Sequence, residues 1–499
     1  MLVAIRFTRD TIDFGGPMRR KFWAGLIGAS SLCISLAGAE PALAADVAPP
    51  MLTKAPVASA PNWTGFYLGA NVGYGIGRNP SSVGFSDSDA VESFTQTPAG
   101  VLGGFQAGYD LQSGPMVFGI EGDWQWSAQH IDSCLISCSA ETAVTFNQRL
   151  QSFGTLRGRL GVSTGSSLLY ATAGWAVANI TNDVGVAGGF GSYANAASFR
   201  HTASGWTAGG GIETAIGGNW TAKVEYLYAD FGNVSDSIFT APGGGFIPFT
   251  TVATSDLHEH IVRAGINYRF NGSVAPGTES ATPWQALQAA PVTWTGVYVG
   301  GNLGYGIGQN RSALAQTNSP AFFVPEKFTM SPGGIVGGVQ AGYNWQAGHI
   351  VAGVEADFQG GGQKDTACMQ NCDEFFGVNV VERQSWFATV RGRIGYAAGS
   401  SLLYATGGYA VTDVKTDLQT NFGFKSGSAS FNTTRSGWTL GGGIETMIAP
   451  NWSTKVEYLY TDYGSISNSL VLTGPEYSIL NSDLHDHVVR AGVNYHFGG

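Results

Sequence analysis

The second half of this chain repeats the first. Residues 63–69 (WTGFYLG) return as residues 294–300 (WTGVYVG), and Lys223–Tyr228 returns letter for letter as Lys455–Tyr460. The offset stays between 227 and 234 residues along the whole chain, so the repeated unit is a complete domain and not a short solenoid repeat. The sequence therefore predicts two copies of one fold, and each local pattern can be compared with its second copy.

The N-terminal segment has the pattern of a secretory signal peptide. The basic triplet Arg19–Lys21 precedes an apolar run, and Ala42–Ala44 then offers a cleavage site made of small residues. We therefore predict a signal peptide over residues 1–44, with residues 1–17 as an upstream extension. An exported chain is the consequence.

Composition argues against several classes of protein. Without residues 1–44, the chain has 20 Lys and Arg against 32 Asp and Glu, whereas nucleic-acid binding needs a positive surface. Beyond residue 45 there is no run of about 18 apolar residues, so a membrane-spanning helix is not expected. With 73 glycines and 12% charged residues, the chain favours β architecture. Residues 45–62 and 271–293, rich in Ala and Pro, are predicted as a leader and a linker.

Within each copy, apolar and polar residues alternate with the period of a β-strand. The first copy has eight such segments, near residues 64–77, 100–111, 116–128, 150–162, 167–180, 204–216, 219–231 and 257–270. Short turns alternate with long polar loops between them, which is typical of a membrane-spanning β-barrel with periplasmic turns and outward loops. We therefore predict an all-β chain of two tandem eight-stranded antiparallel transmembrane β-barrels, over residues 63–270 and 294–499.

The face opposite the apolar one carries four acidic and four basic residues in each copy, identical in type at matched positions. They are Glu121, Asp123, Arg157, Arg159, Glu213, Lys223, Glu225 and Arg263, and then Glu355, Asp357, Arg391, Arg393, Glu445, Lys455, Glu457 and Arg490. A balanced network can satisfy itself in a narrow interior, whereas isolated charges cannot. Because the interior of an eight-stranded barrel is just wide enough for side chains, we interpret this network as a plug. A charge-lined conduction pathway is the alternative.

A single porin-like barrel of sixteen strands is the alternative to two barrels. It needs a short periplasmic turn between the last strand of the first copy and the first strand of the second. Instead, the proline-spaced linker separates Phe270 from Trp294. The two-barrel arrangement is therefore favoured.

Two further sets of residues are candidates for specific chemistry. Each copy has one Cys-x-x-x-Cys pair, and in an exported chain these predict two short disulfide loops: Cys134 with Cys138, and Cys368 with Cys372. Each copy also has two histidines on one face near the outer rim, which are candidate haem or metal ligands, with simple rim polarity as the alternative: His258 and His260, and His485 and His487.

A nucleophile-elbow motif, G-x-S-x-G, occurs at Gly161–Gly165. Such a motif needs a strand–turn–helix context, but this one lies at a predicted hairpin turn, and the second copy has Ala397 in place of Ser163. No nucleophile–base set repeats. We therefore expect neither an enzyme nor a cofactor.

Taken together, these motifs resemble the small outer-membrane β-barrel proteins of α-proteobacteria, a family of surface antigens and haemin-binding or porin-like proteins. The resemblance covers each copy end to end and rests on the W-T-G-x-Y-x-G, G-x-Q-A-G-Y, K-V-E-Y-L-Y and H-x-V-R-A-G-x-N-Y-x-F segments that begin at Trp63 and Trp294, Gly104 and Gly338, Lys223 and Lys455, and His260 and His487. It implies the outer membrane of a Gram-negative bacterium. Because the family usually has one barrel per chain, the tandem duplication departs from its pattern.

We therefore predict an integral outer-membrane protein with a structural or surface-interaction role through its long loops, where specificity is expected to lie. The alternatives are a porin-like transport protein and a receptor for haemin or a host surface. The expected partners are membrane lipid and, through the loops, haemin, cell-wall or host-surface ligands, with no nucleic acid.

Overall fold

Most residues of both copies lie in β-strands that pair with defined neighbouring strands. The computed structural model describes residues 62–86, 88–135, 138, 143–164, 166–188, 193–241, 248–270, 292–317, 325–369, 376–422, 425–471 and 477–497. All of them belong to one compact unit, Pro56–Gly499. The predicted signal peptide, most of the leader and most of the linker lie outside these residues.

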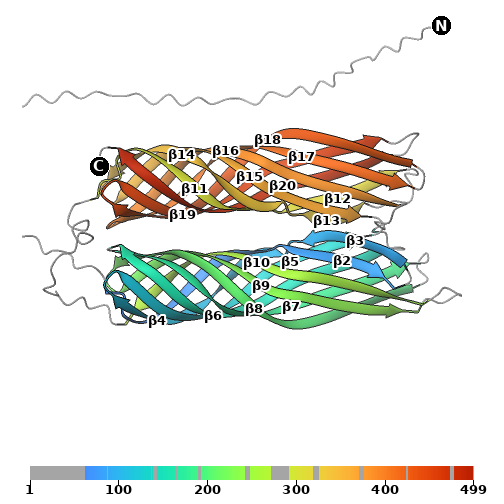
Figure 1. Cartoon of the computed structure of the whole chain (residues 1–499), viewed down its shortest axis with the longest axis horizontal. Helices are drawn as coiled ribbons and strands as arrows, with labels where there is room; N and C mark the ends of the chain where they lie inside the picture. The colour runs from blue at the N-terminus through green and yellow to red at the C-terminus, as the bar shows by residue number, and fades with distance from the viewer. Residues whose placement is uncertain are drawn as a thin grey trace, which may run out of the picture. The chain divides into compact units, whose positions relative to one another are not determined.

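Within the described part of the chain, every regular element is a β-strand, which confirms the all-β prediction (Figure 1). The first repeat contains β1 (Gly65–Gly77), β2 (Asn79–Phe85), β3 (Ser88–Gln96), β4 (Ala99–Ser113), β5 (Met116–Leu135), β6 (Ala143–Thr164), β7 (Ser167–Gly188), β8 (Tyr193–Gly217), β9 (Trp220–Thr240) and β10 (Phe249–Arg269). The second contains β11 (Gly296–Gly308), β12 (Asn310–Thr317), β13 (Glu326–Met330), β14 (Gly333–Ala347), β15 (Ile350–Met369), β16 (Phe376–Ala398), β17 (Ser401–Phe422), β18 (Lys425–Ala449), β19 (Trp452–Val471) and β20 (Tyr477–Phe497). No described helix is long and apolar enough to cross a membrane.

At the end of the short turns, each repeat pairs with itself in antiparallel register. In the first repeat, β1 pairs with β4 and with β10, and β4 through β10 pair in chain order, so that the ladder returns to β1. In the second repeat, β11 pairs in the same way with β14 and β20. Gly114 and Gly348, both with positive φ, form matched short turns, a conformation that favours glycine.

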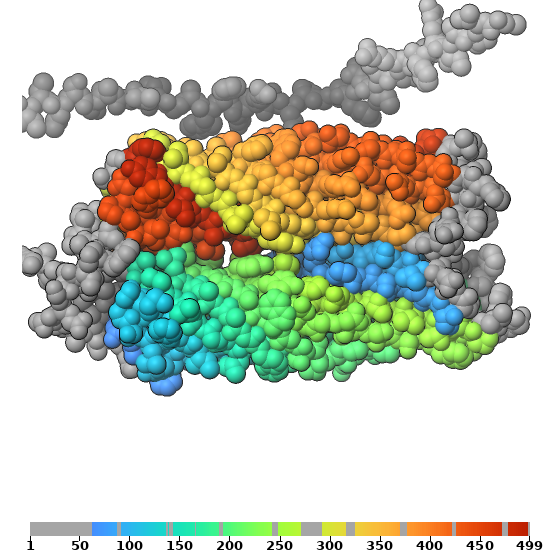
Figure 2. Space-filling model, viewed as in Figure 1, coloured from blue at the N-terminus to red at the C-terminus, as the bar shows by residue number. Residues whose placement is uncertain are grey.

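At the loop end, the two repeats pair with each other. The first strand of each repeat is interrupted at Arg78, between β1 and β2, or at Gln309, between β11 and β12. The second strand is interrupted at Pro98, between β3 and β4, or at Pro332, between β13 and β14. Beyond these breaks β3 pairs with β15, at Ser93 and Cys368, while β13 pairs with β5. Figure 2 shows the blue surface of β2 and β3 against the second repeat. At this end the paired strands therefore form one closed ladder through both repeats, which was not predicted.

Several strands extend well beyond their predicted ends. The β5 strand reaches Leu135 and β7 reaches Gly188, where the alternation predicted ends near residues 128 and 180. The cause is an inversion of polarity along the strands. On the turn side of β5, Trp124 and Trp126 are 41% and 56% exposed, whereas on the loop side Ile131 and Leu135 are only 5% and 0% exposed.

The inversion occurs at a row of β-bulges. In the first repeat, the register shifts at Trp126/Gln129, Leu150/Ser152 and Leu257/His258, and in the second repeat at Gly360/Gln363, Gln384/Trp386 and Asp462/Gly464. Gly232 and Gly464 lie at two of these shifts and have φ values of +73° and +72°, as expected for a glycine bulge. Below this row, large apolar side chains face outward. Above it, they face inward and form one cluster from both repeats, including Phe94, Phe146, Leu314 and Phe328.

Candidate functional site

In the first repeat, the predicted interior charges form one connected network. The Arg157 guanidinium donates to Glu121 at 2.5 Å, to Asp123 at 2.9 Å and to Glu225 at 3.0 Å. Arg263 donates to Asp123 at 2.9 Å and to Glu225 at 2.7 Å. Since strand residues two apart share a face, the pairs of adjacent charged positions on β5, β6 and β9 all point to the same interior.

The remaining members join this network from β6, β8 and β9. The Lys223 ammonium lies 2.9 Å from a Glu121 carboxylate oxygen, and Arg159 donates to Glu213 at 2.5 Å. None of the eight predicted side chains is more than 2% exposed. Four acidic and four basic groups therefore lie together and neutralise one another away from water.

The second repeat has the same arrangement. Arg391 contacts Glu355 and donates to Asp357 at 2.8 Å and to Glu457 at 3.0 Å. Arg490 donates to Asp357 at 2.9 Å, and Lys455, Arg393 and Glu445 occupy the places of their counterparts. These side chains are also no more than 2% exposed. All sixteen predicted charges are therefore interior.

Sequence reasoning missed one charged pair in the first repeat. Asp110 and Arg269 form a buried ion pair at 2.6 Å, and Arg269 also donates to Glu213 at 3.2 Å. The second repeat has Asn344 and His496 at these positions, so a neutral amide and an imidazole stand where the first repeat has two opposite charges. Both positions are on the inward parity of their strands. They were overlooked because residue type differs between the copies.

Tyrosines and amides complete the interior, and they were not predicted as part of it. The Tyr67 hydroxyl donates to Glu121 at 2.7 Å, and Tyr298 donates to Glu355 at the same distance. The Arg159 guanidinium lies 3.9 Å from the centroid of the Tyr170 ring, within the range of a cation–π contact. The interior is thus filled by side chains that hydrogen-bond to one another and neutralise one another's charges.

The four candidate histidines face outward, and two of them, His260 and His487, lie where the two repeats meet. His260 stacks on Tyr305 of the second repeat with ring centroids 5.2 Å apart, and His487 stacks on Tyr74 of the first at 5.4 Å. No group of three or more His, Cys, Asp and Glu side chains within the described ranges is arranged to hold a metal ion. Haem or metal binding stays a prediction.

His258 and His485, the other two candidate histidines, lie beside carboxylates. His258 Nε2 is 3.9 Å from Asp230 and from Asp256, and His485 Nε2 is 3.8 Å from Asp462. Both side chains are partly exposed, at 23% and 27%. They are therefore the more accessible member of each pair.

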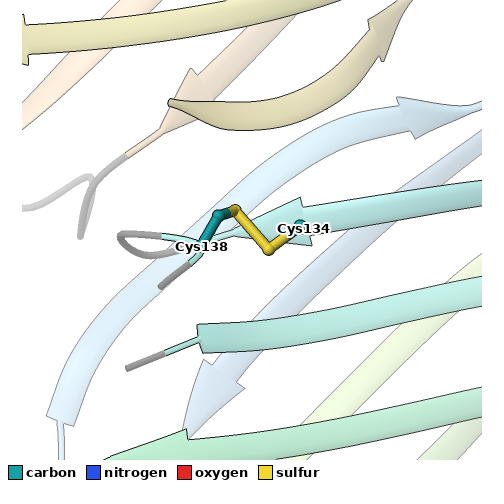
Figure 3. Close-up of a disulfide and its surroundings, with 2 residues drawn as sticks. All are labelled: Cys134 and Cys138. Carbon is teal, nitrogen blue, oxygen red and sulfur yellow. A yellow bond between two sulfur atoms is a disulfide. The ribbon is translucent and has the colours of Figure 1, made fainter. Parts of the chain in front are cut away.

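The first cysteine pair and the serine of the elbow-like motif both make structural contacts. Cys134 at the end of β5 forms a disulfide with Cys138, as predicted (Figure 3). Cys372 lies outside the described residues, so the second disulfide stays a prediction. The Ser163 hydroxyl, from the elbow-like motif, accepts a hydrogen bond from the Trp63 indole at 3.1 Å.

On the loop side of the bulges, the interior contains a carboxyl group with a neutral counterpart in the other repeat. Glu382 is fully buried and contacts Asn310, while the matched Gln148 accepts a hydrogen bond from Asn79 at 2.5 Å. Burial raises the pKa of Glu382 to about 8, with the Asn310 hydrogen bond opposing the shift. Desolvation therefore favours the protonated acid here.

Comparison with known sequences gives a consistent result for both repeats. Residues 47–270 and 281–497 match the family described as "Outer membrane protein beta-barrel domain". The chain is 36% identical over 243 residues to the "31 kDa outer-membrane immunogenic protein" of Brucella melitensis, which covers 48% of this chain and 99% of the relative. It is 35% identical over 182 residues to the "22 kDa outer membrane protein" of Rhizobium leguminosarum, covering 36% of this chain and 70% of that one.

Among solved structures, a Pseudomonas aeruginosa FadL homologue matches 87% of this chain and 90% of its own, with 11% identity and a TM-score of 0.25. Neisserial surface protein A matches 42% of this chain and 98% of its own, with 12% identity and a TM-score of 0.21.

Proposed function

Because the chain belongs to the outer membrane protein β-barrel family, as a tandem duplication in the Gram-negative outer membrane, we propose that it is a closed, non-conducting barrel protein with a surface role. Each repeat crosses the membrane as an eight-stranded barrel. The observation that carries this proposal is the buried, mutually neutralised charge network inside each repeat. An ion would have to break several short contacts to pass.

The outward faces below the bulges favour membrane insertion of both repeats. Ile120 and Phe105 in the first repeat are 53% and 61% exposed, and Val390 and Val339 in the second are 62% and 66% exposed. From Met116 to the bulge after Trp126, β5 has the length of a membrane-crossing β-strand, about 9–11 residues. The bulge row then lies at the outer membrane surface.

The strand pairing favours two barrels over one of sixteen strands. Below the bulges, β1 pairs with β4 and β11 pairs with β14, which closes each repeat on itself. In the described part of the chain, the pairings between repeats are those of β3 with β15 and of β13 with β5, both on the loop side. The closed ladder through both repeats is therefore a feature of the part outside the membrane.

The extended outer part supports a surface role over transport or catalysis. Its interior is packed with apolar side chains such as Phe94, Phe146 and Phe328, so it presents a solid support for loops. The relatives are named as outer-membrane and immunogenic proteins. We propose that the loops contact cell-wall or host-surface ligands.

Single-channel recording in planar bilayers tests the closed state. The full mature chain is inserted into the bilayer, and the current is recorded in about 1 M KCl, where the electrostatic screening length is about 3 Å. We expect no stable open level. A matched double variant, Arg157→Ser with Arg391→Ser, removes one central cation from each network and should open measurable conductance. A large, stable level from the unaltered chain would overturn the proposal.

A further inference from the structure

The outward faces of the two repeats cover each other along part of their length. Ile212 and Ile444 are neighbours of interior glutamates and so point outward, yet they are 0% and 1% exposed. At the turn end, Ser167 and Ser401 lie 2.5 Å apart, oxygen to oxygen. At the bulge row, the two histidine–tyrosine stacks described above join the repeats.

Between these contacts lies an apolar groove of about 970 Å³. One wall comes from β1, β9 and β10 of the first repeat and includes Val72, Ala264 and Ile266. The other wall comes from β17, β18 and β19 and includes Leu403 and Ala405. The volume is at the upper end of the range of ligand sites, about 300–1,000 Å³. At this depth no water is available to fill an apolar space, so the occupant must be apolar.

The groove continues into a polar pocket at the bulge row. Tyr74 and Tyr458 line both, and the pocket adds Arg311, Tyr460 and His485 within about 680 Å³. This level is the outer membrane surface in the proposed orientation. An apolar groove with a cationic, hydroxyl-bearing end has the polarity of a lipid with an anionic headgroup.

Two arginines near the bulge row differ in their contacts, and this difference leaves one cation available. Arg78 donates to the Ser331 carbonyl at 2.9 Å and lies 3.5 Å from Asp365, so the second repeat already binds it. Arg311, which stands at the position of Pro80 in the first repeat, is exposed, and no hydrogen bond or ion pair of its guanidinium occurs among the described residues. Arginine is well suited to phosphate because its planar fork can donate two hydrogen bonds.

We propose that this groove binds a phosphate-bearing lipid of the outer leaflet, with an acyl chain between the repeats and the phosphate on Arg311. The Tyr460 hydroxyl and the partly exposed His485 lie in the same pocket and add donors to the headgroup. This inference rests on the proposed membrane insertion of both repeats. It does not depend on whether the interiors conduct.

Native mass spectrometry of the full mature chain in detergent tests the site. The probes are phosphatidylglycerol and phosphatidylcholine with identical acyl chains. We expect one retained lipid, with phosphatidylglycerol preferred about tenfold, because phosphatidylcholine carries the same phosphate together with a choline cation that Arg311 repels. Arg311→Gln should bring phosphatidylglycerol down to the phosphatidylcholine level. If Arg311→Gln keeps the preference, the headgroup assignment is wrong.

Filling the groove tests the acyl-chain assignment. Ala405→Trp from one wall, or Ala264→Trp from the other, should abolish retention of both lipids, whereas Ala107→Trp on the lipid face of β4 should bind like the unaltered chain. Retention by both groove variants would overturn the site. Loss of the headgroup preference in excess inorganic phosphate, with the lipid still bound, would show a free-phosphate site instead. The heat-dependent band shift in electrophoresis confirms that each variant is folded, and the bilayer recording tests the closed interior separately.

Discussion

The difference between the two interiors provides a test of charge neutrality inside a barrel. The first repeat has the buried ion pair Asp110–Arg269, and the second has Asn344 and His496 instead. The perturbation is to convert one repeat into the other, through Asp110→Asn, Arg269→His and the double variant. If neutrality governs stability, each single change should be costly and the second should add little to the cost of the first.

The expected magnitudes follow from the contacts. Removing one partner of a buried ion pair costs about 3–5 kcal/mol. Asp110→Asn leaves Arg269 with Glu213 at 3.2 Å and the Trp63 carbonyl at 2.6 Å, so we expect the lower end, about 3 kcal/mol. Arg269→His leaves Asp110 with Arg159 at 3.5 Å and should cost about the same. The double variant should cost about 3 kcal/mol instead of the additive 6, a coupling of about 3 kcal/mol.

The assay is urea unfolding of the full mature chain in lipid vesicles, followed by tryptophan fluorescence, with the electrophoretic band shift as a check of the folded state. The reciprocal series in the second repeat, Asn344→Asp, His496→Arg and both together, is the matched control. It should show the same sign of coupling. Additive losses in both series would refute the reasoning, because the pair would then act as two independent contacts.

Three further outcomes are expected. Glu382→Gln should flatten the pH dependence of unfolding: burial raises the pKa of Glu382 from 4.5 to about 8, so its protonated form stabilises the fold at acid pH and this stability is lost as the pH rises from 4.5 through 8. An unchanged difference between unfolding at pH 5 and pH 9 would contradict this. Ile120→Arg, on the lipid face, should cost about 2–4 kcal/mol in urea unfolding, whereas Asp132→Arg above the bulges should change stability by less than about 0.5 kcal/mol; equal effects would argue against the membrane boundary. The double variant Cys134→Ser, Cys138→Ser removes the disulfide and should lower the free energy of unfolding by at most about 2 kcal/mol, because the bridged loop is so short. Failure of this variant to fold would show a larger role for the disulfide.

The membrane part of the fold could be predicted from the sequence because one pattern describes it. Inward charges such as Glu121 and Arg157 alternate with outward apolar residues such as Ile120, so parity assigns each side chain to a face. The predicted interior residues consequently lie in the interior. Asp110 and Arg269 obey the same parity, and only their lack of identical counterparts kept them out of the prediction.

The outer part could not be predicted in the same way. Above the bulges, Ile131 and Leu135 face inward and Asp132 faces outward, so the polarity is that of a water-soluble sheet. The sequence of such a segment reads as a polar loop when the apolar face is assumed to be outside. Two breaks before Pro98 and Pro332 add to this, because proline interrupts a ladder and ends the recognisable strand.

The exchange of β3 and β13 follows from the duplication itself. Both are matched segments, with Phe94 at the position of Phe328 in the shared apolar cluster. An edge that accepts one can accept the other, since pairing uses the backbone and both present an inward phenylalanine. Two equivalent partners in one chain make an exchange of strands between the repeats inexpensive, as in domain swapping.

This equivalence predicts how a single repeat should behave. In residues 45–270 alone, behind the native signal peptide, β3 has no β15 to pair with and β5 has lost β13, but the two free edges belong to neighbouring strands of one barrel. We expect β3 to pair with β5, with Phe94 taking the place of Phe328 against Phe146. The isolated repeat should therefore give the electrophoretic band shift of a folded barrel and a cooperative urea transition. Phe94→Ser should destabilise the isolated repeat by about 3 kcal/mol or more, the cost of losing a buried phenylalanine. If the single repeat shows no folded band, the exchanged strands are essential to closure and the two repeats are one folding unit.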